Sequence, residues 1–395
     1  MKKKVVTIFT GLVKLNKNLV GTAVVYQQLA YWLNKNNFSV NLVIPEKNDD
    51  QLAGVDYFIY QEKNNKKLIQ QSDIIFFGAY PPIEPLKYAY QQKKNIITYL
   101  WSIAPIGSLE FKDFTDIHQQ EKLHDFIVAS YNLSLKYSNK IFCRSQRVKD
   151  LVLGSLITLG KANLSNYLKD RNFNNLIEVV SFGIGSTVRH SQKDNYRKLF
   201  KNIQAKDFVL IWNGGIWNWH DGVKLVKIMN YIKQRDKKIK LIFQGFHNPD
   251  KIYSIEAKKT KQLADKLKLT DKNIFFPTNW VNFENRDNYL TESDAGIVIS
   301  PNIPEANYFI KTRFYDYLWA DIPIILNNYE AFAGEVATHN LGLILSGDYK
   351  KDAATIIKFV NDKKLQLKIK HNIKKYKKDL SWEKQLKAVI EYCKK

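Results

Sequence analysis

Residues 300–328 read SPNIPEANYFIKTRFYDYLWADIPIILNN, and this stretch indicates the fold of the half of the chain that contains it. Two apolar runs, residues 295–299 and 322–326, flank it and predict buried strands. Between them, apolar side chains recur at helical intervals and predict one buried face of a helix that begins near Phe309. A strand, a helix and a second strand in this order are typical of a parallel sheet.

A charged cluster lies inside the same stretch, namely Glu305, Lys311, Arg313 and Asp316. The predicted helix begins just after the carboxyl end of the first strand, where open parallel sheets bind ligands. A helix N-terminus at that place favours anions such as a diphosphate. An amphipathic helix with a merely solvated charged face would show the same spacing. The pattern by itself therefore leaves both a binding site and an ordinary surface helix open.

The stretch resembles the donor-binding element of GT-B glycosyltransferases of the large group 1, or family 4, type. In that family a carboxylate, usually Glu, stands seven residues before a Pro that opens the next strand, and it binds the ribose hydroxyls of a nucleotide sugar. Asp316 occupies this position before Pro323. The partner Glu of the family, eight residues earlier, is replaced here by Tyr308. The stretch is more similar to a subgroup of the family. The motif of that subgroup is a Glu, a few residues, Phe-Arg-Thr-Arg and then Asp-Tyr-Leu-Trp-Ala-Gly, and Glu305 matches its Glu.

The resemblance also implies roles for the charged residues. Ordinary relatives carry Arg and Lys where this chain has His220 and Asp221, so the phosphate cations are expected to be Lys311 and Arg313. The implied catalytic residues are Lys311, Arg313 and Glu305, and the implied donor-binding residues of this stretch are Asp316 and Thr312. We expect Lys311 and Asp316 to face a solvent-filled cleft and not the core.

The second domain is expected to open with a strand at residues 208–212, in FVLIWNGGIWNWHDG. Glycines after this strand would let backbone amides approach a diphosphate. The phrase GGIWNW is typical of the subgroup, and in resembling enzymes a strand ending near Trp280 and Val281 places backbone groups against the nucleotide base. The donor-binding candidates outside the 300–328 stretch are Asn213, Gly214, Gly215, Gly245, Trp280 and Val281.

The first part of the chain alternates short, mostly β-branched apolar runs with helical patterns, which predicts right-handed βαβ units. The expected strands are residues 5–10, 38–44, 73–77, 95–100, 140–144 and 178–181. We therefore predict an α/β protein with two Rossmann-like, doubly wound domains that face a central cleft, the GT-B arrangement. The expected boundaries are residues 1–185 for an acceptor-side domain, 186–206 for a linker, 207–378 for the donor domain and 379–395 for a C-terminal helix that returns to the N-terminal domain.

Three residues of the first domain are candidates for the acceptor side of the cleft. Gly21 belongs to a glycine-framed loop after the first strand, although a flexible connection explains this loop equally. Trp101 is a candidate for stacking on a sugar, and Arg144 follows a strand but also fits a charged loop face. His118 and His124 have no second His or Cys three or four residues away, so we expect structural roles for them and no metal site.

The chain of 395 residues has a formal net charge of +23, which favours polyanions or an anionic membrane surface as partners. Its lysines are scattered and no zinc-finger or RNA-binding signature is present, so nucleic acid is not expected. Biased composition without a function is the third explanation. Two cysteines exclude a disulfide framework, and no apolar run is long enough to span a membrane. We expect a cytoplasmic protein that is peripheral at the inner face of the plasma membrane.

The resemblance implies a retaining glycosyltransferase of the hexosyltransferase type that needs no metal or other cofactor. Its co-substrate would be a nucleotide-diphosphate sugar, with UDP as the expected nucleotide. The acceptor would be a glycan or a lipid-linked sugar of bacterial cell-surface polysaccharide synthesis. Two other functions of the same fold stay open, a nucleotide-sugar 2-epimerase and a non-catalytic subunit that supports a partner enzyme.

Overall fold

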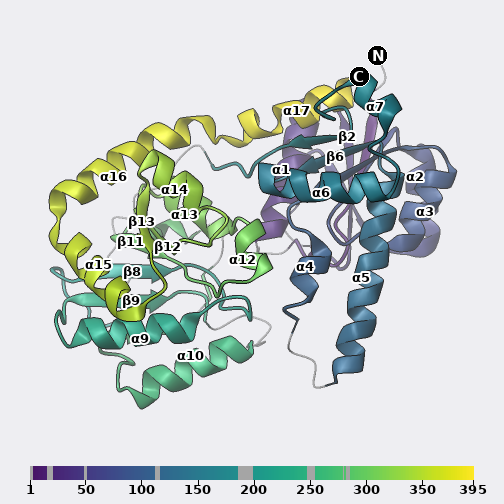
Figure 1. Cartoon of the computed structure of the whole chain (residues 1–395). Coiled ribbons are helices and arrows are strands. Elements are labelled where there is room, and N and C mark those ends of the chain that lie inside the picture. Colours follow the sequence, from purple (N-terminus) through teal and green to yellow (C-terminus); the bar gives the residue numbers. More distant parts are fainter. Residues whose placement is uncertain are drawn as a thin grey trace. The chain divides into compact units, whose positions relative to one another are not determined.

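The computed structural model describes residues 3–15, 21–48, 51–111, 116–185, 199–246, 254–278, 280–281 and 285–395. The chain divides into two compact units (Figure 1). Unit 1 consists of Met1–Gly183 and Trp382–Lys395, and unit 2 of Ile184–Ser381. Each unit is described by itself below.

Unit 1 contains a seven-stranded parallel sheet with the order β3-β2-β1-β4-β5-β6-β7. Its strands are β1 (Val5–Phe9), β2 (Ser39–Ile44), β3 (Val55–Ile59), β4 (Ile74–Phe77), β5 (Asn95–Leu100), β6 (Lys140–Cys143) and β7 (Ile177–Val179). Its helices are α1 (Gly21–Lys35), α2 (Glu62–Gln71), α3 (Ile83–Gln91), α4 (Ala104–Ser108), α5 (Ile117–Tyr137), α6 (Gln146–Thr158), α7 (Leu164–Lys169) and α17 (Trp382–Lys394). Strands β4 and β6 are buried along their whole length, as expected of a sheet with helices on both faces.

Unit 2 contains a six-stranded parallel sheet with the order β10-β9-β8-β11-β12-β13. Its strands are β8 (Phe208–Trp212), β9 (Ile239–Phe243), β10 (Ile274–Phe275), β11 (Ala295–Ile297), β12 (Ile324–Asn327) and β13 (Gly342–Leu345). Its helices are α9 (Gly222–Lys233), α10 (Ile255–Lys266), α11 (Asp287–Leu290), α12 (Pro304–Tyr308), α13 (Thr312–Trp319), α14 (Ala333–His339), α15 (Tyr349–Asn361), α16 (Lys363–Tyr376) and the 3₁₀ turn η2 (Lys377–Asp379). The chain thus builds two doubly wound sheets, which confirms the predicted fold class.

The strand order of unit 2 reverses between β8 and β11. The chain first adds β9 and β10 on one side of β8, and it then returns to add β11, β12 and β13 on the other side. The loops after β8 and β11 therefore diverge at this point, and such a switch point is where open α/β sheets bind ligands. The corresponding reversal in unit 1 lies between β1 and β4.

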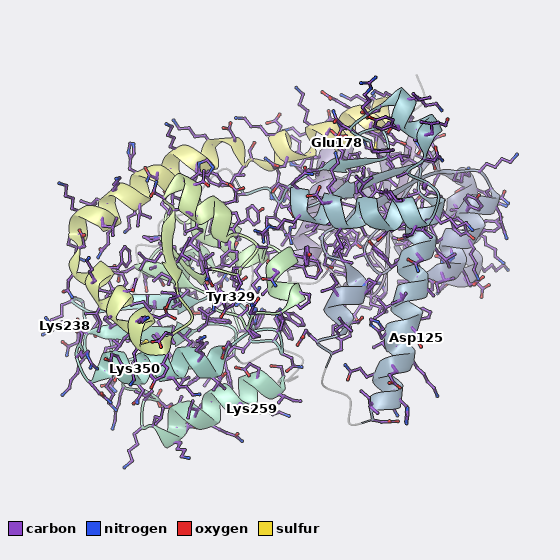
Figure 2. The ribbon with its side chains drawn as sticks, viewed as in Figure 1. Asp125, Glu178, Lys238, Lys259, Tyr329 and Lys350 are labelled. Atoms are coloured by element: carbon purple, nitrogen blue, oxygen red, sulfur yellow. The ribbon has the colours of Figure 1, made fainter. Side chains whose placement is uncertain are left out.

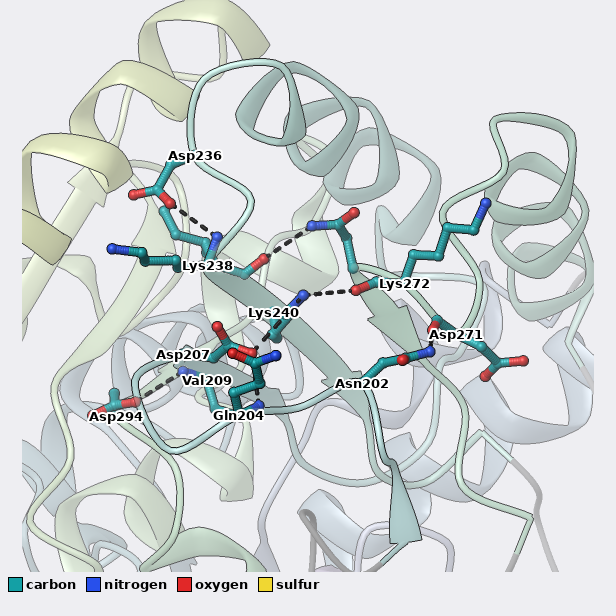
Figure 3. Close-up of polar contacts among 12 residues, drawn as sticks. Asn202, Gln204, Asp207, Val209, Asp236, Lys238, Lys240, Asp271, Lys272 and Asp294 are labelled. Atoms are coloured by element: carbon teal, nitrogen blue, oxygen red, sulfur yellow. Dashed lines mark hydrogen bonds and ion pairs between the residues drawn. The ribbon is translucent and has the colours of Figure 1, made fainter.

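The described end of the expected linker is attached to unit 2 (Figure 3). Asn202 Nδ2 donates to the backbone oxygen of Asp271 at 2.7 Å, and the backbone N–H of Gln204 donates to Asp207 Oδ2 at 2.8 Å. The ring of Phe200 packs against that of Phe275. Residues 199–206 therefore belong structurally to unit 2, whereas residues 186–198 of the expected linker lie outside the described residues.

Helix α17 packs in unit 1, although it follows unit 2 in the sequence. The ring of Trp382 packs against that of Phe182 at a tilt, with 4.6 Å between centroids. At the other end of the helix, Lys4 Nζ donates to the backbone oxygen of Cys393 at 3.2 Å, and Tyr392 Oη donates to Asn95 Oδ1 at 3.2 Å. The chain therefore crosses from unit 2 back to unit 1 at residues 381–382.

Two local expectations differ from the structure. The helix predicted to begin near Phe309 begins three residues later, at Thr312, as α13, because Phe309 adopts an extended backbone; the short helix α12 before it was not predicted. Strand β3 was not predicted from the sequence. It is the edge strand of its sheet and most of its residues are only partly buried, so it lacks a continuous apolar run. In the described part of the chain, no helix combines the length and the apolar character that crossing a membrane requires.

Candidate functional site

The predicted charged stretch lies at the switch point of unit 2, between the ends of β8 and β11. Asn213, Gly214 and Gly215 follow β8 directly. Gly214 has a φ of +79°, a backbone conformation that glycine adopts without strain. A Cβ atom on Gly245, in the loop after β9, would lie 2.3 Å from the carbonyl carbon of Gly214. The two loops can therefore approach each other only because glycine occupies position 245.

Two helices begin at this edge of the sheet, but their N-termini differ. At α9, the N–H of Val223 donates to Glu256 Oε1 and the N–H of Lys224 to Asp221 Oδ1, each at 2.9 Å. Carboxylates of the protein thus already occupy the start of α9. At α13, the N-cap residue Lys311 makes no side-chain capping bond, and the first N–H groups, beginning with Thr312, have no intrahelical partner. The start of α13 is therefore the better place for an external anion.

Arg313 presents a buried cation at the start of α13. Its Nη2 donates to the backbone oxygen of Gly215 at 2.9 Å, and its guanidinium lies 5.2 Å from the centre of the Trp212 ring. Among the described residues, Nη1 of Arg313 is buried without a hydrogen-bond partner. Burial lowers the pKa of Arg313 from its ordinary value, although the guanidinium remains charged at neutral pH.

Lys311 is held between two carboxylates. Its Nζ lies 2.7 Å from Glu330 Oε2 and 3.5 Å from Glu305 Oε2. The exposed fractions of the three side chains are 6% for Lys311, 0% for Glu330 and 9% for Glu305. Burial opposes the charge on Lys311, but the two carboxylates outweigh it and raise the pKa of Lys311. This group is a buried ion pair with a second carboxylate beside it.

The expectation that Lys311 faces a solvent-filled cleft is wrong. The side chain follows the end of α12 into the interior, where the loop after β12 supplies Glu330. Glu330 was not identified from the sequence. A single acidic residue just after a buried strand was the only available signal, and it does not name its partner.

Asp316 is one turn further along α13, and both of its oxygens are engaged. Oδ1 lies 3.0 Å from Arg286 Nε, and Oδ2 accepts from Asn213 Nδ2 at 2.9 Å. Its side chain is 19% exposed. Burial raises the pKa of Asp316, and the nearby Arg286 opposes this shift without cancelling it. The structure therefore brings Asp316 and Asn213 together as predicted candidates and adds Arg286, which the sequence pattern did not indicate.

Tyr317 connects α13 to the end of β8. Its hydroxyl donates to the backbone oxygen of Ile211 and accepts from the backbone N–H of Asn213, each at 3.1 Å. Burial raises the pKa of Tyr317 well above its ordinary value, so the hydroxyl stays neutral. A Cβ atom on Gly296 would lie 2.4 Å from the Tyr317 ring, so only glycine in β11 leaves room for that ring.

His220 occupies a position where ordinary members of the resembling family carry a cation, but it is neutral. It is 3% exposed, its Nδ1 accepts from the backbone N–H of Trp217 at 2.9 Å, and its ring meets Trp212 edge to face. Burial lowers the pKa of His220 well below its ordinary value, and the charges of Arg313 and Lys311 add to this effect. Since Nδ1 is an acceptor, the proton of the neutral ring is on Nε2.

The remaining donor-side candidates are less well organised. Trp280 and Val281 are half-buried and lie outside the strands of the described chain. The strand expected to end beside them is β10, which ends at Phe275. Among the described residues, no three His, Cys, Asp or Glu side chains are arranged to hold a metal ion.

The acceptor-side candidates all lie in unit 1. Gly21 is the first residue of α1, and Arg144 packs its guanidinium 5.0 Å from the centre of the Phe182 ring. Trp101 is 4% exposed and meets Tyr26 edge to face, with ring centroids 4.9 Å apart. In this structure Trp101 therefore packs the interior of unit 1, and a sugar could not stack on its ring without a local rearrangement.

Comparison with solved structures identifies the fold. Sucrose-phosphate synthase (tll1590) from Thermosynechococcus elongatus is 12% identical, with a TM-score of 0.70 over 99% of both chains. Anabaena Alr3699/HepE in complex with UDP and glucose is 13% identical, with a TM-score of 0.68 over 99% of both chains. WaaG, a glycosyltransferase involved in lipopolysaccharide biosynthesis, is 12% identical, with a TM-score of 0.64 over 97% of this chain and 98% of that chain.

At these identities the likeness shows the fold alone. The chain has the GT-B glycosyltransferase fold, which confirms the architecture expected from the sequence. No protein-family model matches the chain, and no curated protein matches it in sequence.

Replacing Lys311 with Met should destabilise unit 2 by about 3–5 kcal/mol, because it leaves Glu330 and Glu305 buried without a cation. The double variant Lys311→Met/Glu330→Leu should recover most of this loss, since it removes the charge pair together. Urea unfolding of the single and double variants measures both effects. As a control, Lys261→Met breaks an exposed pair with Asp265 and should change stability by at most about 1 kcal/mol. A loss for Lys311→Met no larger than that of the control would contradict a buried ion pair.

The pKa of His220 predicts a loss of stability in mild acid. In the folded protein the ring resists protonation, whereas in the unfolded chain it binds a proton at its ordinary pKa. Stability from this group is therefore complete above about pH 6.5 and falls as the pH decreases, by at most about 1.4 kcal/mol per pH unit.

The His220→Asn variant should be less stable overall but should lose less further stability between neutral and mildly acidic pH, because Asn accepts from Trp217 without titrating. Denaturant unfolding over a pH series provides the slopes. The exposed His118→Asn should retain the slope of the unmodified protein. Equal slopes for His220→Asn and the unmodified protein would rule out the buried neutral ring as the cause.

Proposed function

We propose that this protein is a glycosyltransferase that moves a sugar from a nucleotide-diphosphate sugar, with UDP as the nucleotide, to a glycan or lipid-linked acceptor with retention at the anomeric carbon. The GT-B fold supports the proposal, as do similar structures described as a glycosyltransferase of lipopolysaccharide biosynthesis and as complexes with UDP, glucose and UDP-glucose. We assign the reaction to the synthesis of bacterial cell-surface polysaccharide.

One observation carries the proposal, namely the buried Arg313 guanidinium with an unpartnered Nη1. Leaving a buried charged donor unpaired is unfavourable, so such a group in a native site is best explained by a ligand that completes it. The group lies at the switch point, beside Gly214 and Gly215 and at the start of α13. A diphosphate would satisfy Nη1 and the free N–H groups of the first turn together.

The proposed contacts extend from the diphosphate to the nucleoside. Asp316 would accept hydrogen bonds from the ribose hydroxyls, since each carboxylate oxygen can accept a further bond beside those from Arg286 and Asn213. The backbone at Trp280 and Val281 would contact the base. Gly245 would keep the loop after β9 clear of the bound donor.

In the proposed reaction the bond between the anomeric carbon and the diphosphate oxygen breaks while the acceptor hydroxyl forms the new glycosidic bond on the same face of the sugar. A donor phosphate oxygen takes the acceptor proton. The leaving diphosphate gains negative charge, and Arg313 with the start of α13 would stabilise it where water is excluded. Lys311 and Glu305, the other two implied catalytic residues, would act indirectly, because their buried ion pair with Glu330 holds the start of α13 in place.

Replacing Arg313 with Met tests whether the Arg313 guanidinium binds the diphosphate. Met fills a similar space beside Trp212 but cannot bind an anion, so affinity for UDP should fall by about 1.5–3 kcal/mol, or roughly 10- to 150-fold. Calorimetric titration with UDP measures the loss. The melting temperature should not fall, because the substitution removes a buried charge that lacks one partner.

The matched control is Arg235→Met, which removes an exposed arginine of the same unit and should leave UDP affinity unchanged. The proposal also requires that the unmodified protein bind UDP. A ligand at 100 times its Kd adds about 2.7 kcal/mol to stability, which a thermal-shift measurement detects. If UDP and UDP-sugars produce no shift at any concentration, the protein is not a UDP-dependent transferase.

Replacing Asp316 with Asn separates nucleoside from diphosphate recognition. The variant retains the shape but loses the charged acceptor, so UDP should bind about 1.5–3 kcal/mol more weakly, whereas inorganic pyrophosphate should bind as before. Competition of both ligands against a labelled UDP provides the comparison. Asp321→Asn, which breaks a nearby ion pair with Lys377, is the control for a general loss of packing. Normal UDP binding by a destabilised Asp316→Asn protein would make Asp316 a structural residue.

A further inference from the structure

Helix α16 and the turn after it carry an unusual concentration of positive charge. Residues 363–378 contain eight lysines, one histidine and no Asp or Glu. Unit 2 as a whole, residues 184–381, has 34 basic and 21 acidic residues, so this short segment supplies eight of its 13 excess positive charges. The charge of the unit is therefore not evenly distributed over its surface.

The fold gathers part of this charge on one face of the helix. The opposite face is buried through Gln366, Ile369 and Ile373. The exposed positions recur every three or four residues, which is the spacing of one helix face. Apart from Lys363 at the first position of the helix, they are Lys364, Leu367, Lys368, His371, Lys374 and Lys375, and we call these six residues the basic stripe.

The lysines of the basic stripe have no ionic partners among the described residues. Elsewhere on the surface, lysines pair with acids one turn away, as Lys261 does with Asp265 at 2.7 Å. Lys364, Lys368 and Lys374 each have another lysine or a histidine one turn away, and like charges at this spacing repel each other, whereas Lys375 has Asp379 one turn further on. Helix α16 lies along the outside of unit 2, and no other element of that unit covers its outer face (Figure 1).

The basic stripe also contains an apolar side chain that the described residues leave largely exposed. Leu367 is 70% exposed and lies between Lys364 and Lys368 on the same face. The stripe extends about 17 Å along the helix axis from Lys364 to Lys375. A helix with lysines around an exposed apolar residue can lie in the plane of a lipid surface, with the apolar group among the headgroups and the lysines on lipid phosphates.

We propose that the basic stripe of α16 is a docking surface for an anionic lipid membrane. Charge complementarity favours an anionic partner, and the composition of the stripe favours lipid over nucleic acid. It contains no Arg for bidentate contacts and no Phe, Tyr or Trp ring for base stacking, features on which nucleic-acid surfaces commonly depend. The basic stripe belongs to unit 2.

The proposal is tested by vesicle flotation with the full-length protein. Vesicles contain equal parts of phosphatidylglycerol and phosphatidylcholine, or phosphatidylcholine alone. We expect partition into the anionic vesicles only, weakening as salt shortens the reach of the charges to roughly 8 Å at physiological ionic strength. Replacing Lys364, Lys368, Lys374 and Lys375 together with Gln should reduce the partition coefficient at least tenfold, since each lysine near an anionic surface contributes roughly fivefold.

The matched control removes the same charge from four other exposed lysines of unit 2, and it should change partition by no more than about twofold. These residues are Lys227, Lys237, Lys238 and Lys258. Lys238 lies at the margin of unit 2 (Figure 2). Equal losses in the two variants would mean that overall charge and not the basic stripe drives binding, and the proposal would then fall.

A second variant separates lipid from nucleic acid. Leu367→Gln leaves the charge unchanged and should lower partition into anionic vesicles by roughly three- to tenfold, because it removes the apolar contact. Fluorescence anisotropy with a labelled single-stranded oligonucleotide measures nucleic-acid binding by the same variants. If the four-lysine variant loses oligonucleotide binding but floats like the unmodified protein, the stripe recognises nucleic acid and the membrane proposal is wrong.

This outcome is independent of the proposed function. The basic stripe is separate in sequence from Arg313 and Asp316, so the four-lysine variant should retain the UDP affinity and the melting temperature of the unmodified protein. For the unmodified protein, flotation without UDP binding would count against the transferase, and UDP binding without flotation would count against the docking surface.

Discussion

The candidate site depends on the buried ion pair between Lys311 and Glu330. This pair joins the first turn of α13 to the loop after β12, two segments that are neighbours only in the folded sheet. Glu305, from α12, adds a second carboxylate to the same cation. Charges that have left water need such geometry to be tolerated, so the pair fixes the position of α13 and with it the direction of Arg313.

Helix α13 then carries most of the site on its successive turns. Arg313 contacts the loop after β8 through Gly215, Asp316 contacts Asn213 in that loop, and the Tyr317 hydroxyl bonds to its backbone. Arg313, Asp316 and Tyr317 of α13 therefore all contact the loop after β8. A displacement of α13 would move the cation and the carboxylate together, which suits a ligand with a phosphate and a sugar hydroxyl at a fixed separation.

The site also places its positive charge differently from the pattern of the family that the sequence resembles. His220 is neutral and buried, and Asp221 caps α9 together with Glu256, so the loop after β8 contributes no cation there. The charge comes instead from α13, on the other side of the switch point. Since a diphosphate needs compensating charge but not from a particular strand, the two arrangements can serve the same anion.

The sequence by itself determined the alternation of strands and helices and the two doubly wound sheets, because hydrophobic period and turn residues are local properties. It also predicted Arg313, Asp316 and Asn213 as site residues, and the structure brings Asp316 and Asn213 into contact. Only the tertiary structure decided that Lys311 is buried, that Glu330 and Arg286 complete the charges, and that lysines of α16 share one uncovered face. Lys311 and Glu330 are 19 positions apart in the sequence, and Arg286 and Asp316 are 30 apart. Whether such residues pair, and whether their charges are buried, depends on which loops the strand order brings together, and a local sequence pattern does not contain this information.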